Sequence, residues 1–553
     1  MSGSITLENR FGVNKMELIS LKYAIFVIVL LVLYYCFPKK YRWYVLLAGS
    51  MAYYVIICKW YVLFIIFTIC TTYGSTIWID KLLKKQNAIV KSHKEDWDRQ
   101  TRKDYKEKGR KKRVAVMLFA LLCNFGILAF LKYIPYAGEL GLLLPLGISF
   151  YTFQSMGYVM DVYREIVEPE KNFLKVALFV SFFPQIIQGP IAIYDKLAGQ
   201  LYEGHSLRLE NLQKGALLVL WGVMKKLVIA DRAVNIINFV MDKPMDFSGT
   251  YVFFAAVVYA LQLYADFSGG IDIVRGIAEM FGITMSTNFN HPYFSRSLTE
   301  YWHRWHMTLG DWCRNYIFYP LSISKRFLNF GKWLKPRFGA HISKVLPGCI
   351  ASVITFIVIG VWHGANMKYL YFGLWNGIVI MLAELFAPVS KKVAGGFFKL
   401  TGLREKGIFA TIVSVIWTFM LILVGYYFDI AANASTAFHM LFKSVTDFHI
   451  SELGINNIIL NLGACGLDEY DILLLIICTL LWFFISFVEE NKKLDMRDFI
   501  LSRKLPLRWA IIYLGIFIVI IFGYYGPGVN PADFVYICLL YTSPSPRDPK
   551  TSR

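Results

Sequence analysis

The chain has 553 residues, of which 56% are hydrophobic, 17% aromatic and only 17% charged, and its mean hydropathy is positive at +0.48. The surface of a soluble protein normally requires about 25% charged residues. This composition excludes a disordered chain, a collagen, a coiled coil and an ordinary soluble enzyme. Apolar runs of about 20 residues can cross a bilayer as helices, so the sequence predicts an all-α polytopic membrane protein.

The apolar runs predict about 11 to 13 membrane helices, a count that includes re-entrant and interfacial elements. One run, residues 215–240, carries Lys225, Lys226, Asp231 and Arg232. We expect it to be tilted, re-entrant or interfacial, because charged side chains inside a membrane are costly. The other runs are 17–37, 43–58, 61–79, 114–131, 139–160, 173–194, 250–282, 346–367, 369–388, 408–430, 472–489 and 509–525.

The net charge of +20 is distributed unevenly between these runs. Residues 81–113 contain 14 Lys and Arg against 5 Asp and Glu, and residues 286–345 contain 9 against 2, whereas 431–471 contain one Lys and five acids. Basic loops tend to stay in the cytoplasm. We therefore predict a plasma-membrane protein with 81–113 and 286–345 inside and with 431–471 and the N-terminus outside. Topology explains the basic charge without a nucleic-acid partner.

The pattern predicts a single membrane domain over residues 1–536, with its core motifs between 140 and 390. The polar end, 541–553, differs in composition from everything before it, and we expect a disordered or non-native tail. The nine Cys residues contain no C-x-x-C pair, so we predict no metal site.

One candidate for chemistry is His363, in the sequence Gly-Val-Trp-His-Gly-Ala-Asn at 360–366. It closes an apolar run, where an idle ionisable group is costly. A histidine has a pKa near neutral and suits general-base catalysis. The alternative is a structural histidine that donates to a backbone carbonyl.

A second candidate is His306, within the aromatic, basic stretch 288–319. Trp302, Arg304 and Trp305 precede it closely. The plainer interpretation of such a stretch is an interfacial belt of Trp and Tyr. The spacing from His306 to Asp311 also matches the H-x4-D pattern of glycerolipid acyltransferases, although one such spacing often arises by chance.

A third candidate is the segment 264–275, in which Asp266 and Ser268 lie beside a pair of glycines within an apolar run. Carboxylates at such a place suggest a function, and a structural ion pair is the alternative.

Taken together, these segments resemble the membrane-bound O-acyltransferase superfamily. The closest likeness is to its bacterial branch of alginate and peptidoglycan O-acetyltransferases and teichoic-acid D-alanyl transferases. The matching stretches occur in the family's order and are Pro145–Gln154, Ser181–Pro190, Val223–Arg232, Asp266–Gly269, Trp302–His306, Tyr316–Pro320 and Trp362–Gly364.

The resemblance implies that His363 is the catalytic base and His306 the second family histidine, with Trp302, Arg304, Trp305, Asp266, Ser268 and Asn366 in supporting or tunnel-lining positions. It implies transfer of an acyl group, most often acetyl, from a cytoplasmic thioester to a hydroxyl outside. The donor would be acetyl-CoA or an acyl-carrier protein, and we expect no tightly bound cofactor.

The expected partners are membrane lipid, the cytoplasmic donor, and an extracytoplasmic acyltransferase or envelope polysaccharide. D-Alanyl transfer to teichoic acid remains open. Two functions of other classes also remain open: a transporter or flippase of a wall precursor, and a non-catalytic scaffold.

Overall fold

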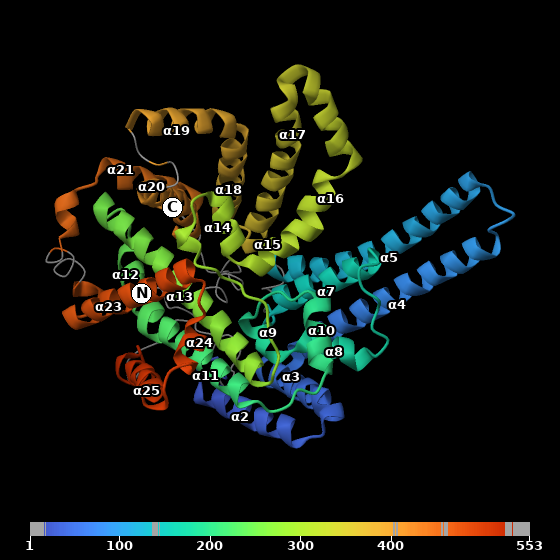
Figure 1. Ribbon diagram of the computed structural model, residues 1–553, viewed down its shortest axis with the longest axis horizontal. Coiled ribbons are helices and arrows are strands. Elements are labelled where there is room, and N and C mark those ends of the chain that lie inside the picture. The colour runs from blue at the N-terminus through green and yellow to red at the C-terminus, as the bar shows by residue number, and fades with distance from the viewer. Residues whose placement is uncertain are drawn as a thin grey trace, which may run out of the picture. The chain divides into compact units, whose positions relative to one another are not determined.

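The computed structural model describes residues 18–134, 144–401, 407–454 and 463–525, together with residues 16, 142, 404, 457 and 534. Within these residues every regular element is a helix and none is a strand, which confirms the predicted all-α class (Figure 1). The predicted tail 541–553 lies outside the described residues, as does most of the N-terminal segment that precedes Leu18.

The chain divides into two compact units. The first unit comprises the residues up to Val219 and the segment Ile271–Ser286, and the second comprises Leu220–Gly270 and the described residues from Thr287 onward. The predicted single domain over 1–536 stays a prediction. Helices of the first unit are α2 (Leu21–Cys36), α3 (Arg42–Cys58), α4 (Val62–Ser92), α5 (Arg99–Tyr133), α7 (Ile148–Tyr163), α8 (Phe173–Ser181), α9 (Phe183–Gln188) and α10 (Tyr194–Tyr202).

Two helices pass from one unit into the other, α11 (Leu209–Met224) and α13 (Gly249–Met280). The elements of the second unit are the π-helix η3 (Lys225–Ala230), α12 (Asp231–Met241), the one-turn η4 (Pro292–Phe294), α14 (Leu298–Arg304), α15 (Met307–Cys313), the π-helix η5 (Arg314–Phe318), α16 (Tyr319–Ser322), α17 (Lys325–His363), α18 (Met367–Leu385), α19 (Ala387–Thr401), α20 (Ile408–Ile430), α21 (Ala434–Thr446), α23 (Glu469–Lys492), α24 (Met496–Leu501) and α25 (Leu505–Phe522).

By length and composition, seven helical stretches of the described chain could cross a membrane, or eight if the bent pair α18 and α19 counts as one. This is fewer than the 11 to 13 predicted elements, because the runs 43–58 and 61–79 count as one stretch, Lys39–Ser92, and other runs form helices that are too short or broken. Residues 173–194 form two short helices, with Pro184 in the first turn of α9, where its missing N–H and fixed φ are tolerated. The run 215–240 is interrupted by the π-helix η3, which agrees with the expectation that it is no simple span.

The basic segment 81–113, predicted as the cytoplasmic connection between two apolar runs, is helical over most of its length. α4 continues to Ser92 and α5 starts at Arg99, where Asp98 accepts hydrogen bonds from the N–H groups of Gln100 and Thr101. Lys, Arg and Gln are good helix formers, so charge alone did not indicate a loop. The two helices run side by side (Figure 1) and pack closely at Gly109, where an added Cβ would lie 2.0 Å from Gln86 Oε1.

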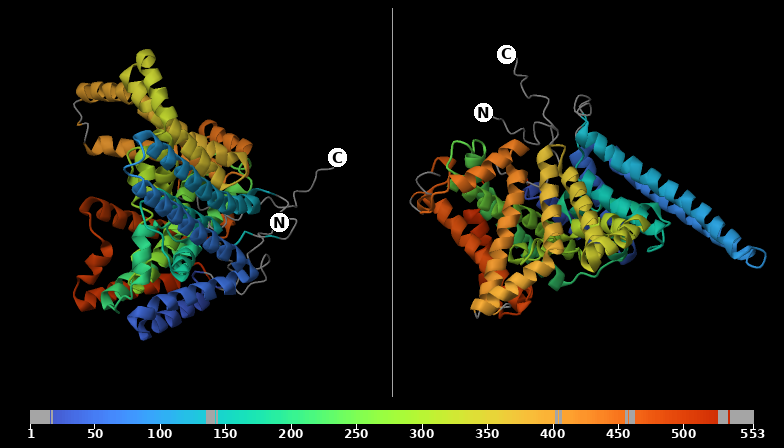
Figure 2. Two further views of the ribbon diagram at one scale, coloured as in Figure 1. Left: turned by 90° about the vertical axis from the view of Figure 1, so that its right-hand side faces the viewer. Right: turned by 90° about the horizontal axis from the view of Figure 1, so that it is seen from above.

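In the second unit, α17 consists of two arms that meet at Gly339, which has a φ of +81° (Figures 1 and 2, yellow). The long second arm packs against α18. The contact is close because Gly360 lies against the backbone of Tyr369 and Gly373 lies against that of Phe356, with no room for a Cβ at either place. α20 packs on the other side of α18, and Trp375 donates to the carbonyl oxygen of Leu421 at 2.8 Å. These three helices hold the site described below.

A candidate active site with two histidines

His306 lies at the junction between α14 and α15, at the first sharp turn after the aromatic helix. Its φ is +45° and its ψ +52°, a left-handed conformation that a residue other than glycine adopts uncommonly. The residue is buried, at 3% exposure, and its ring meets the Phe267 ring edge-on with 4.9 Å between centroids. Strained backbone of this kind is concentrated at functional sites.

Asn288 holds the inner side of this turn. Its Oδ1 lies 3.1 Å from Nδ1 of His306, 3.1 Å from the backbone N of Thr308 and 2.9 Å from Thr308 Oγ1. Its backbone oxygen also accepts from the N–H of Met307 at 2.9 Å. The Asn288 side chain is fully buried.

His363 is the last residue of α17. The chain leaves the helix at Gly364 in an extended conformation, and an added Cβ there would lie 2.5 Å from the Tyr369 ring. The His363 ring is half-buried and stacks on Tyr369 with 6.0 Å between centroids, while Trp362 and Phe372 meet it edge-on at 4.9 and 5.6 Å. The missing side chain at Gly364 therefore allows the aromatic contacts that orient His363.

Both histidines line one cavity of about 30 Å³. A space of this size has room for about two or three water-sized groups, because a water needs about 10–15 Å³ on this measure. All the lining residues belong to the second unit, and four of them are candidates from the sequence. The lining residues are Leu263, Tyr301, Trp302, Trp305, His306, Leu309, His363, Phe372, Asn376, Ile422, Tyr426 and Asp429.

Burial lowers the pKa of His306 to about 3, and the nearby His363 acts in the same direction. His306 is therefore neutral at physiological pH and carries one ring proton. In the unfolded chain a histidine titrates near pH 6.5, so the unfolded state binds more protons than the folded state between about pH 6.5 and 3. Burial of His306 thus destabilises the fold progressively as the pH falls through that window.

Hydrogen bonds fix the polar groups of the cavity wall. Trp302 donates its Nε1–H to Oδ1 of Asn376 at 3.0 Å, and Asn376 donates to the carbonyl oxygen of Phe372 at 2.8 Å. The hydroxyls of Tyr301 and Tyr426 lie 2.8 Å apart.

Asp429 supplies a carboxylate to the same wall. Tyr259 donates its hydroxyl hydrogen to Oδ2 of Asp429 at 2.7 Å. Lys368 lies close by and donates to the backbone oxygens of Asp429 and Ala431 at 2.8 and 2.7 Å. The cavity therefore contains two imidazoles and a carboxyl group among aromatic rings, a set suited to moving a proton.

Two of the predicted supporting residues, Asp266 and Ser268, do not line this cavity. Asp266 accepts from the Lys226 ammonium at 2.7 Å, and the same ammonium lies 2.8 Å from Asp231. Ser268 accepts from the neighbouring Lys225 at 2.8 Å. These contacts tie η3 to α13. The structural ion pair considered as the alternative for segment 264–275 is also present, since Arg275 lies 3.4 Å from Asp272.

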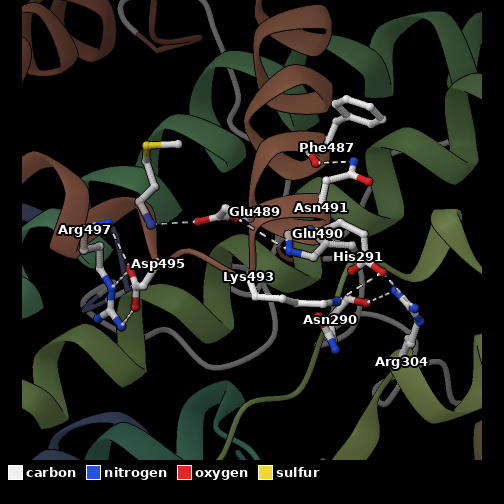
Figure 3. Close-up of polar contacts among 11 residues, drawn as sticks. Asn290, His291, Arg304, Phe487, Glu489, Glu490, Asn491, Lys493, Asp495 and Arg497 are labelled. Carbon is white, nitrogen blue, oxygen red and sulfur yellow. Dashed lines mark hydrogen bonds and ion pairs between the residues drawn. The ribbon is translucent and has the colours of Figure 1, made fainter.

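Arg304 and Asn366 also lie outside the cavity lining. Arg304 pairs with Glu490 at 3.0 Å (Figure 3) and with Glu300 at 2.7 Å. Nearby, His291 lies 3.7 Å from Glu489, so both acids at the end of α23 face the segment that leads into α14. Asn366 accepts from the N–H of Lys368 and caps α18.

Sequence reasoning missed Asn288, Asn376, Tyr426 and Asp429. A signal was available for Asp429, since it is an ionisable residue near the end of the apolar run 408–430. Asn288 lies in the stretch singled out around His306, but its role depends on a turn that spacing alone does not show. Among the described residues, no group of three His, Cys, Asp or Glu side chains is arranged to hold a metal ion.

These observations define a class of protein: a helical membrane protein with a histidine-lined cavity among its long apolar helices. Residues 169–335, which include His306, match the model of the membrane-bound O-acyltransferase family. The resemblance found in the sequence motifs is thereby confirmed.

Three relatives illustrate the match. A probable alginate O-acetylase of Pseudomonas syringae pv. tomato is 30% identical over 56% of this chain and 54% of its own length. A peptidoglycan O-acetyltransferase of Helicobacter pylori is 30% identical over 50% of this chain and 56% of its own. A teichoic acid D-alanyltransferase of Bacillus subtilis is 26% identical over 51% of this chain and 67% of its own length. The chain thus spans little more than half the length of the acetylating relatives.

Proposed function

We propose that this protein is a membrane O-acyltransferase that moves an acetyl group from a cytoplasmic thioester to a hydroxyl of an envelope polysaccharide. The observation that carries the proposal is the shared cavity of His306 and His363, which is lined in part by the segment that matches the membrane-bound O-acyltransferase family. The two acetylating relatives named above support acetyl as the acyl group.

In the proposed reaction, the acceptor hydroxyl oxygen attacks the carbonyl carbon of the thioester. His363 accepts the hydroxyl proton as the new C–O bond forms, the C–S bond breaks, and the proton passes to the departing thiolate. General-base catalysis of this kind contributes about 10²–10⁴-fold. The stacked Tyr369 and the edge contacts of Trp362 and Phe372 support this role, because they hold the imidazole in one orientation.

The route of the substrates is part of the proposal. The basic residues of the α4–α5 hairpin and of 286–345 favour a cytoplasmic side for both, where acetyl-CoA or an acyl-carrier protein would deliver the acyl group. The acceptor would be an envelope polysaccharide, or a partner acyltransferase, on the outer side. In this arrangement the N-terminus is outside.

A second candidate is D-alanyl transfer to teichoic acid. The observation that favours it is Asp429, whose carboxyl group lines the cavity. A carboxylate there could pair with the ammonium of an alanyl group, which an acetyl group lacks. The 26% identity to a teichoic acid D-alanyltransferase, which extends over about half of this chain, also supports this candidate.

The test is the chemistry of the envelope. Deleting the gene should remove ester-linked acetyl from the envelope. Restoring the wild-type gene should bring the acetyl back, whereas restoring His363→Ala should leave the envelope as in the deletion strain. Base-released acetate and D-alanine from the purified envelope measure the two acyl groups separately. Loss of D-alanine alone would establish the second candidate. Unchanged acetate and D-alanine in the deletion strain would contradict acyl transfer and move the transporter and scaffold forward.

A further inference from the structure

The contacts of Asn288 identify which of its side-chain atoms faces His306. A backbone N–H can only donate, and the N–H of Thr308 points at the same Asn288 atom as Nδ1 of His306, at 3.1 Å each. That atom must therefore be the carbonyl oxygen and not the amide nitrogen. A carbonyl oxygen only accepts, so the imidazole must donate to it.

This assignment determines the tautomer of His306. A neutral imidazole carries one hydrogen, and the hydrogen bond that one nitrogen makes decides where it lies. Since Nδ1 donates to Asn288, Nε2 keeps its lone pair and can accept a proton or a hydrogen bond.

Backbone geometry reinforces the same arrangement. The left-handed φ of +45° at His306 turns the chain so that residues 304–308 lie along 288–290. Two backbone hydrogen bonds hold this pairing, from Met307 N to Asn288 O at 2.9 Å and from Asn290 N to Arg304 O at 3.0 Å. Asn288 is thus fixed at both its backbone and its side chain, and it can hold the ring as well as the turn.

We propose that Asn288 is a positioning residue that keeps His306 in the Nδ1–H tautomer and so presents an unprotonated Nε2 to the cavity. Nothing in the family match or in the names of the relatives assigns a role to this residue. The catalytic consequence rests on the proposed function, whereas the tautomer itself does not.

The first test uses Asn288→Leu and Asn288→Asp in the full-length protein in nanodiscs, with acetyl transfer measured from pH 5 to 9. Leu matches the size of Asn but accepts no hydrogen bond, so the rate should fall at least about tenfold at every pH, as when a catalytic imidazole takes the wrong tautomer. Asn290→Leu is the matched control. It makes the same exchange two residues away at an exposed side chain, and it should keep the wild-type rate.

Asn288→Asp separates positioning from packing. A carboxylate still accepts from Nδ1–H, so the rate should approach that of wild type near pH 9. The added negative charge raises the pKa of His306. Nε2 then becomes protonated as the pH falls, and the variant should lose activity toward pH 5 more steeply than wild type. The other titratable groups that line the cavity, Tyr301, His363, Tyr426 and Asp429, are the same in both proteins.

An Asn288→Leu rate within twofold of wild type would overturn the proposal. So would an Asn288→Asp variant as slow as Asn288→Leu at every pH, because Asn288 would then be only a packing residue. A substrate-free measurement completes the test. In protein labelled with [15N]histidine, the signal lost in His306→Gln should show a protonated Nδ1 and a bare Nε2. The opposite pattern would overturn the proposal, even if wild type transferred no acyl group and the proposed function failed.

Discussion

At the residue scale, the two histidines are held in different ways. His306 is buried on a strained turn and anchored through Nδ1, whereas His363 is half-buried at a helix end among aromatic rings. Both residues were predictable from the sequence, because the His lies in a short motif in each case. Asn288 was not, since its importance depends on one left-handed residue 18 positions further along the chain.

Gly364 tests whether the aromatic packing around His363 matters. In Gly364→Ala the new methyl would lie 2.5 Å from the Tyr369 ring, which stacks on His363. Overpacking of this kind costs about 1–3 kcal/mol. We expect a lower thermal unfolding midpoint and at least a tenfold lower rate of acyl transfer.

The control for this variant is Gly348→Ala, in the same helix, where an added Cβ would meet nothing within 4 Å. It should leave the rate of acyl transfer unchanged and should not lower the unfolding midpoint, because Ala is favoured over Gly in a helix interior by about 0.5–1 kcal/mol. If Gly364→Ala matched Gly348→Ala in stability and rate, the close contact with Tyr369 would have no role in placing His363.

At the element scale, hydropathy located the long helices but not their breaks or extensions. The apolar run 173–194 is two helices because Pro184 can begin a helix but not continue one. In the basic hairpin the helices are instead longer than the apolar runs, since α4 and α5 continue far past their apolar parts. There the close packing at Gly109 and the hydrogen bond from Arg113 to Gln86 at 2.9 Å hold the two helices together beyond their apolar parts.

The hairpin also tests the orientation of the chain. Lys94 is exposed between α4 and α5, and Val445 is exposed in α21, within the segment predicted to be outside. With Lys94→Cys and Val445→Cys, an impermeant maleimide should label only the second variant in intact cells and both after permeabilisation. The wild-type chain provides the background of its own cysteines. Labelling of Lys94→Cys in intact cells would reverse the predicted orientation.

At the scale of the whole molecule, the sequence predicted the class, and four of the eight predicted site residues line the cavity. Trp302, Trp305, His306 and His363 come together although up to 61 residues separate them, because α17 and α18 bring His363 back to the α14–α15 junction. Asp266, Ser268, Arg304 and Asn366 lie in or beside the motifs, but they serve as ion-pair partners, a hydrogen-bond acceptor and a helix cap. Motif membership did not separate these roles, since they depend on which face of each helix meets the cavity.

The most direct test of the account is acyl transfer by the purified protein in nanodiscs, with labelled acetyl thioester and a polysaccharide acceptor, for wild type and His363→Ala. If His363 is the base, the variant should fold with an unchanged unfolding midpoint and transfer acetyl at least about 10²-fold more slowly. A well-folded His363→Ala protein that transfers acetyl at close to the wild-type rate would contradict the account.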